Sequence, residues 1–97
     1  MQSLLQKAIS RIERGWTQHA MARDADGERV RLSDDPKACS WCLCGAIQGD
    51  DFKASNALYN LLFDRLPKGF RNLSEWNDEP GRTLDEVLAL LRSVVQM

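Results

Sequence analysis

The sequence predicts a mainly α-helical fold, a compact bundle of about four helices that forms a single globular domain over residues 1–97. Three observations lead to this prediction. The length of 97 residues suits one domain. The apolar share of 43% and the charged share of 28% are those of an ordinary globular protein. Apolar residues also recur at helical spacing in several segments, which are separated by turn residues.

The first helix is predicted over about residues 4–14, with Ser3 as its cap and Gly15 after its end. Its apolar side chains follow the spacing of one helix face: Leu4, Leu5, Ala8, Ile9 and Ile12. Its basic side chains share another face: Lys7, Arg11 and Arg14. We interpret this basic face as a solvated surface.

Residues 16–32 do not follow a helical pattern. Asp24 to Gly27 read as a turn, and Glu28 to Leu32 alternate polar and apolar residues as a strand does. Trp16 to Ala22 form the candidate partner strand, although their alternation is weaker. A short β-hairpin or an ordered loop is therefore expected between the first two helices.

A second helix is predicted to start with Asp35 as cap and Pro36 at the first helical position, and to end near Gly49. Almost every residue from 38 to 47 is apolar or small. A helix that is apolar on all sides belongs in the middle of a fold, so we expect this helix to be central.

A third helix is expected to begin after a cap at Asp50 or Asp51 and to end before Pro67. Its apolar face would consist of Ala54, Ala57, Leu58, Leu61, Leu62 and Leu66. The three-residue spacing of the next large apolar residues predicts one short helical turn that pins a loop to the core: Phe70, Leu73 and Trp76.

The last helix has the clearest signal. Thr83 and Glu86 match a capping box, in which each side chain bonds a free backbone N–H of the other residue. Asp85 and Glu86 also suit the positive end of the helix dipole. The predicted buried stripe consists of Leu84, Val87, Leu88, Leu91, Val94 and Val95.

Charge and hydropathy exclude several classes of partner. The net charge is −1, with 13 basic and 14 acidic residues, which argues against nucleic acid as a partner. No segment approaches the roughly 20 apolar residues of a membrane-spanning helix, so no membrane partner is expected. Three cysteines form an odd count without any sign of export, which favours reduced thiols and a cytoplasmic location.

Cys39 and Cys42 have the C-x-x-C spacing of a dithiol or of half a zinc site. A structural zinc site needs four converging ligands. On a helix Cys44 would point away from the other two, and His19 is the only histidine available. We therefore interpret the cysteines as small buried hydrophobes and expect no metal and no cofactor. A thiol or zinc protein using Cys39 and Cys42 remains an alternative.

The loop before the last helix is the candidate ligand-binding site. It gathers an aromatic ring, an amide, a carboxylate, a guanidinium and a hydroxyl: Trp76, Asn77, Asp78, Arg82 and Thr83. Helix N-termini attract anions, and Arg82 would add a forked donor. In the alternative interpretation the loop is a structural clasp: Trp76 anchors it in the core, and Arg82 pairs with a nearby acid. We favour the clasp.

Three motifs together resemble a family of small bacterial and phage proteins of unknown function, domain of unknown function 6197. They are Gly15-Trp16, Trp41-Cys42-Leu43-x-Gly45-Ala46-Ile47, and Trp76-Asn77-Asp78 followed by Arg82-Thr83-x-x-Glu86-Val87. The resemblance covers nearly the whole chain. It implies a compact helical fold and a cytosolic, often phage-linked setting, without an activity, a cofactor or a catalytic residue.

These observations favour a non-enzymatic protein-interaction module, which binds another protein or a second copy of itself. The sequence contains no glycine-rich phosphate loop and no metalloprotease pattern, and His19 has no evident catalytic partner. For a phage-borne gene, inhibition of a host defence protein would be one form of this function. The alternatives are binding of a small anion at the Trp76–Thr83 loop and the thiol or zinc protein.

Overall fold

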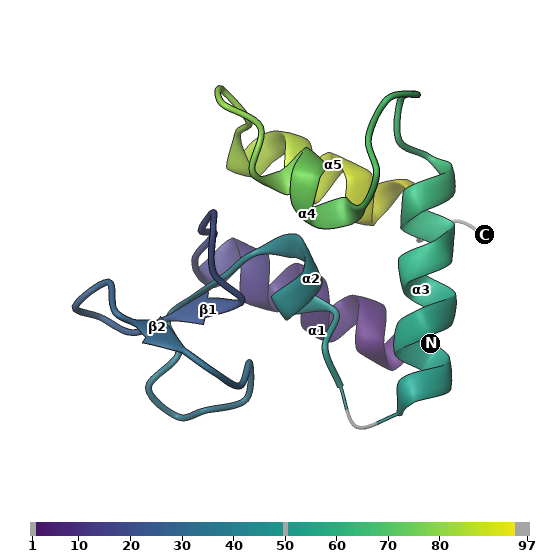
Figure 1. The fold of residues 1–97 in the computed structure, drawn as a ribbon. Helices are drawn as coiled ribbons and strands as arrows, with labels where there is room; N and C mark the ends of the chain where they lie inside the picture. Colours follow the sequence, from purple (N-terminus) through teal and green to yellow (C-terminus); the bar gives the residue numbers. More distant parts are fainter. Residues whose placement is uncertain (1, 50, 95–97) are drawn as a thin grey trace.

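The computed structural model describes residues 2–49 and 51–94, so two residues assigned above, Asp50 and Val95, lie outside the described residues. Within the described ranges the chain forms five helices and a small sheet (Figure 1). In chain order the elements are α1 (Gln2–Arg14), β1 (Ala22–Arg23), β2 (Arg29–Val30), β3 (Ser40–Trp41), α2 (Leu43–Ala46), α3 (Phe52–Asp64), α4 (Leu73–Asn77) and α5 (Leu84–Ser93). The fold is thus helical with a three-stranded antiparallel sheet, and the prediction of a four-helix bundle is wrong in its second helix.

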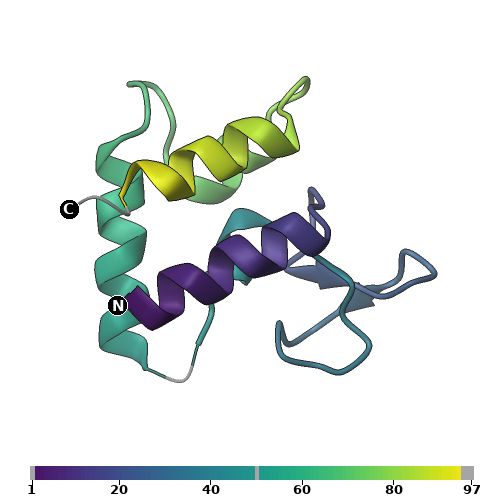
Figure 2. The ribbon, with the colours of Figure 1, turned by 180° about the vertical axis from the view of Figure 1, so that it is seen from behind.

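Helices α1 and α5 lie side by side and run in opposite directions, and α3 crosses near one end of both (Figure 2). Helix α5 begins after Thr83, its predicted cap, and both hydrogen bonds of the capping box are present. An ion pair of 2.8 Å between Arg92 and Glu13 joins the two helices at the surface. The core fills the space between these helices, with Ile12, Leu58 and Leu91 completely buried.

The predicted start of α3 is confirmed, whereas its predicted apolar face is confirmed only in part. The carboxylate of Asp51 accepts the backbone N–H of Ala54 at 3.1 Å and caps α3. Of the apolar face predicted for α3, Leu58 and Leu62 are buried, whereas Ala57 is exposed. The expected short helical turn is α4. The side chain of Asn72 accepts the backbone N–H of Glu75 and so caps this helix.

The segment between α1 and α2 is a hairpin. Strands β1 and β2 pair antiparallel, with Ala22 opposite Val30. The turn between them contains Gly27, whose φ of 82° suits glycine. The first strand begins at Ala22, so the partner strand predicted over residues 16–22 is placed wrongly. A third strand that the sequence did not predict, β3, pairs with the other side of β1.

The predicted central helix is mostly extended chain. Asp35 and Pro36 form a turn, in which the Asp35 carbonyl accepts the N–H of Ala38 at 2.9 Å. Residues 39–42 then run beside β1, and the N–H of Cys39 donates to the Arg23 carbonyl at 2.8 Å. An apolar run does not by itself distinguish a buried strand from a buried helix. Here backbone partners on β1 decide in favour of the strand, and only Leu43–Ala46 are helical.

Gly45 allows the closest approach between α2 and the hairpin. A methyl group built on Gly45 would overlap the carbonyl oxygen of Met21. We expect Gly45→Ala to lower the free energy of unfolding by about 1–3 kcal/mol, because a backbone atom would have to move. Helix propensity alone would give the opposite sign. The measurement is urea unfolding followed by circular dichroism.

Gly49→Ala is the matched control for this prediction. Its added methyl group would meet the end of the flexible Leu4 side chain at 3.2 Å, so a much smaller change is expected. A Gly45→Ala protein as stable as the parent would contradict the close approach of α2 and the hairpin.

Candidate functional site

The amide of Asn77 lies at the centre of the predicted loop site, and its side chain is completely buried. Its Oδ1 accepts the indole N–H of Trp16 at 2.7 Å and the backbone N–H of Leu43 at 3.0 Å. Its Nδ2 donates to the Thr17 carbonyl at 3.2 Å and to Asp78 Oδ1 at 2.9 Å. We call this set of five residues the Asn77 clasp. It joins α4 to the chain after α1 and to the start of α2.

Two members of the Asn77 clasp, Asp78 and Asn77 itself, also bond residues 18 and 19. Asp78 Oδ1 accepts the backbone N–H of His19 at 2.9 Å, and Gln18 Nε2 donates to the carbonyl of Asn77 at 3.0 Å. His19 has a φ of 66°, in the left-handed region that few residues other than glycine adopt. Its exposed ring stands 3.6 Å from Asp78 Oδ2. The carboxylate of Asp78 thus helps to stabilise this unusual backbone conformation.

Trp76, Arg82 and Thr83 complete the predicted site. Trp76 is buried, and the Arg82 guanidinium lies 4.0 Å from the centre of its ring. Arg82 Nε donates to the Trp76 carbonyl at 2.8 Å, and its Nη1 pairs with Glu86 at 3.0 Å. Hydrogen bonds from the backbone and hydroxyl of Thr83 lower the pKa of Glu86.

The structure therefore brings the five predicted site residues together, but their polar groups form hydrogen bonds with one another and with neighbouring residues of the fold. None of the four depressions that are described on the molecule is lined by any of them. This geometry supports the clasp interpretation of the loop.

The three cysteines do not lie on one helix, contrary to the prediction. Cys39 precedes β3 and is exposed, so its interpretation as a buried hydrophobe is wrong. Cys42 is buried and caps α2, and burial raises its pKa to about 11. Cys44 is partly buried beside Ser74, and burial raises its pKa as well. Among residues 2–49 and 51–94, no three histidine, cysteine or acidic side chains are grouped so as to hold a metal.

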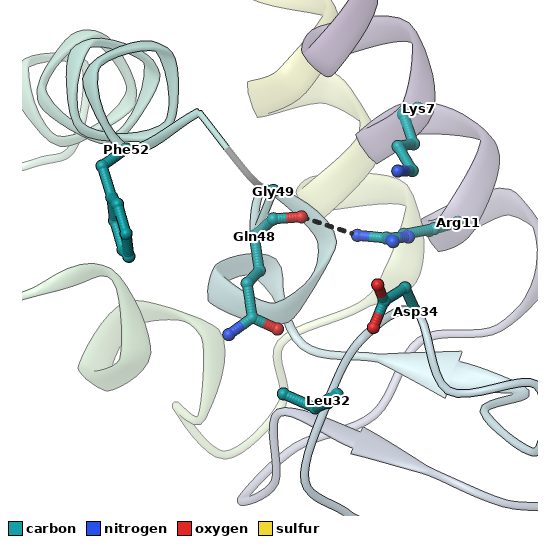
Figure 3. Close-up of a pocket in the computed structure, with 7 residues that line it drawn as sticks. All are labelled: Lys7, Arg11, Leu32, Asp34, Gln48, Gly49 and Phe52. Carbon is teal, nitrogen blue, oxygen red and sulfur yellow. Dashed lines mark hydrogen bonds between the residues drawn. The ribbon is translucent and has the colours of Figure 1, made fainter.

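A depression of about 320 Å³, which was not predicted from the sequence, lies between α1, the loop before β3 and the segment that joins α2 to α3. We call it the Arg11 depression; Figure 3 shows its lining residues, which are Lys7, Arg11, Leu32, Asp34, Gln48, Gly49 and Phe52. Phe52 is 86% exposed and Leu32 is 58% exposed. They are the large apolar side chains found exposed in the described parts of the chain, and both line this one depression.

Arg11 forms the base of the depression and is only 6% exposed, so its assignment to a solvated face is wrong. Its Nη1 donates to the carbonyls of Gly45 and Ala46 at 3.3 Å and of Gln48 at 3.0 Å. These carbonyls lie at the end of α2 and directly after it, where helix carbonyls are often left without a helical partner. Burial lowers the pKa of Arg11, and the nearby charge of Asp34 acts in the opposite direction. Arg11 therefore joins α1 to α2.

Two further depressions, of about 630 and 310 Å³, share lining residues with the first. Together they form what we call the basic face. Its basic residues are Lys7, Arg11, Arg14, Arg29, Arg31 and Lys37, and its acidic residues are Asp24, Asp34 and Asp35. The whole chain has slightly more acidic than basic residues, so this face is basic on an otherwise acidic protein. The ion pairs found between described residues include none of its basic side chains.

One signal in the sequence pointed to this site. Phe52 directly follows the cap Asp51 and lies outside the apolar stripe of α3, where a large aromatic residue has no core to enter. The position of Leu32 and the burial of Arg11 had no local signal, because both depend on contacts between distant segments.

Comparison with models of known protein families matches residues 1–96 to the family of unknown function DUF6197. The match confirms the resemblance inferred from the three motifs. Neither the curated proteins nor the solved structures contain a match to this chain. In the described parts of the chain, no helix has the length and apolar character needed to cross a membrane.

Asn77→Ala tests the clasp. The substitution removes the acceptor of two buried donors, Trp16 Nε1 and the Leu43 N–H, and should lower the free energy of unfolding by about 2–4 kcal/mol. Urea unfolding measures the change. Asn60→Ala is the control, because Asn60 is an exposed asparagine on α3. Equal stability of the two variants would show that Asn77 is not structural.

Thiol labelling tests the placement of the cysteines. At about pH 8 the exposed Cys39 should react rapidly with a disulfide reagent, whereas the two cysteines with raised pKa should react slowly. Mass spectrometry of the labelled peptides identifies the sites. Cys39→Ser should remove the fast phase, and rapid labelling of Cys42 in the folded protein would contradict its burial.

Proposed function

We propose that this chain, which belongs to the family of unknown function DUF6197, is a non-enzymatic protein-interaction module that binds an acidic segment of a partner protein. The observation that carries the proposal is the exposure of Phe52 and Leu32 around the Arg11 depression, within a basic face. The partner would place an apolar side chain between these two residues and its carboxylates against the surrounding basic groups.

The apolar part of the argument concerns Phe52 and Leu32. Burying one large apolar side chain contributes about 1.5–3 kcal/mol, and this gain is not realised for Phe52 in the isolated chain. Isolated exposed apolar residues are common, but two that border the same depression form an anchor point. Such anchors, surrounded by polar groups, are typical of protein interfaces.

The electrostatic part concerns the choice of partner. The basic face is complementary to an acidic surface, and its side chains lack ion-pair partners among the described residues. Nucleic acid is the competing polyanion. Asp34 and Asp35 lie among the basic groups and would repel the densely charged phosphate backbone of a nucleic acid more strongly than an acidic peptide segment. An acidic protein segment with an apolar residue fits these groups better.

The bonding of the loop from Trp76 to Thr83 supports the non-enzymatic part of the proposal. The polar residues from Trp76 to Thr83, which have the richest chemistry in the chain, are engaged in holding the fold together. The three unpaired cysteines support a reducing, cytoplasmic compartment. If the gene is phage-borne, a host defence protein is one class of partner that this module would bind.

Affinity capture from a lysate of the source organism, with three forms of the protein, tests the proposal. The forms are the parent, the double variant Phe52→Ser with Leu32→Ser, and Lys53→Ser. Lys53 is the matched control because it is exposed on the same helix and lines none of the described depressions. A partner held by the parent and by the control should bind the double variant at least about tenfold more weakly, a loss of about 1.4 kcal/mol.

Two further readouts complete this experiment. Binding should weaken as salt is raised, and the contact should map to an acidic segment of the partner. Thermal unfolding should be the same for the three forms, since all the replaced side chains are exposed. Three results would each overturn the proposal: a partner that binds the double variant as tightly as the parent, capture of nucleic acid alone, or repeated absence of a specific partner.

A further inference from the structure

The guanidinium of Arg11 is only partly used by the fold. All three of its hydrogen bonds start from Nη1. Among the described residues, no acceptor is bonded to Nε or Nη2. These two nitrogens are also not among the buried polar atoms that lack a partner, which are Ser33 Oγ and Ser55 Oγ. The remaining donors of Arg11 are therefore not completely buried, and Arg11 is one of the residues that line the depression.

The charge of Arg11 is also incompletely compensated. In the parts of the chain that are described, no carboxylate forms an ion pair with this side chain, although it is 6% exposed. Asp34 lies near it but beyond ion-pair distance, and the centre of the Trp41 ring lies 5.9 Å from the guanidinium carbon. A nearly buried cation without a paired anion is costly, so an anion that enters the depression would be bound favourably.

Lys7 adds a second cation from one turn earlier on α1. Its side chain is exposed, and Figure 3 shows its ammonium group directed towards Arg11. Leu32 and Phe52 provide apolar walls on the other sides of the same depression. A forked donor, an ammonium group and two apolar walls thus converge on one space of about 320 Å³.

Carboxylate and phosphate are the two oxyanions that such a fork accepts. Asp34 stands beside the guanidinium, as Figure 3 shows, and lines the same depression. It would repel a dianionic phosphate about twice as strongly as a carboxylate at the same distance. The apolar walls also suit an acidic residue with an apolar neighbour. These groups favour a carboxylate.

We infer that the Arg11 depression is a carboxylate-binding site, in which Arg11 Nε and Nη2 and Lys7 hold an aspartate or glutamate side chain that follows an apolar residue of the partner. The inference rests on the proposed function and names the group that the module recognises. Arg11 has two roles in this site: Nη1 positions α2, and the other nitrogens bind the ligand.

Two small peptides test the inference without knowledge of the partner. They are N-acetyl-Leu-Glu-amide and N-acetyl-Leu-Gln-amide, which differ in the carboxylate. Titration is followed by NMR through the Nε–Hε signal of Arg11. We expect the glutamate peptide to shift this signal saturably and to bind at least about fivefold more tightly than the glutamine peptide, because hydrogen bonds to a charged acceptor are stronger than those to a neutral one.

Lys7→Gln is the variant of choice, because replacing Arg11 would also remove the cap of α2. This substitution should weaken binding of the glutamate peptide about threefold or more, and Lys53→Gln, the matched control, should leave binding unchanged. Equal binding of the two peptides, no shift with either, or tighter binding of inorganic phosphate than of the glutamate peptide would overturn the inference. If the peptide titration fails but a partner is still captured in a way that depends on Phe52 and Leu32, the carboxylate site is wrong and the proposed function still holds.

Discussion

The buried amide of Asn77 is the interaction on which the rest of the structure depends. A single side chain satisfies an indole N–H and a backbone carbonyl of residues 16 and 17 and the backbone N–H of Leu43, which lies in a separate segment. Buried polar groups are stable only when they are bonded, so these partners hold one another in one arrangement. The segment after α1, the start of α2 and the end of α4 therefore have their relative positions set by one residue.

The clasp and the basic face are connected through α2. This helix has four residues, too few to be stable alone, and side chains from other segments hold both of its ends. Asn77 accepts the N–H of Leu43 at its start, and Arg11 donates to the carbonyls at its end. The side chain that secures the end of α2 is also one of those that line the depression. Arg11 thus stabilises the fold and also lies at the proposed binding site.

The sequence predicted the elements whose causes are local. Helices α1, α3 and α5 have an apolar stripe or a cap within their own residues, such as Thr83 with Glu86. The second helix was placed wrongly because its apolar run suits a strand equally well, and only the position of β1 decides between them. The loop from Trp76 to Thr83 was found as a cluster, but its role depends on Trp16 and Leu43, distant in the chain. Arg11 looked solvated because its partners are backbone carbonyls, which no residue type indicates.

The long sequence separations within the clasp have a consequence for the order of folding. Asn77 is 61 residues from Trp16 and 34 residues from Leu43. Closing such loops costs entropy before any contact compensates it, so α1 and α5 can begin to form locally, whereas α2 must wait for α4 to arrive. The surface that surrounds Phe52 and Leu32 is consequently among the last parts of the molecule to form. A ribosome-bound chain that has not yet released α4 would display these apolar residues without the folded surroundings that they have in the complete molecule.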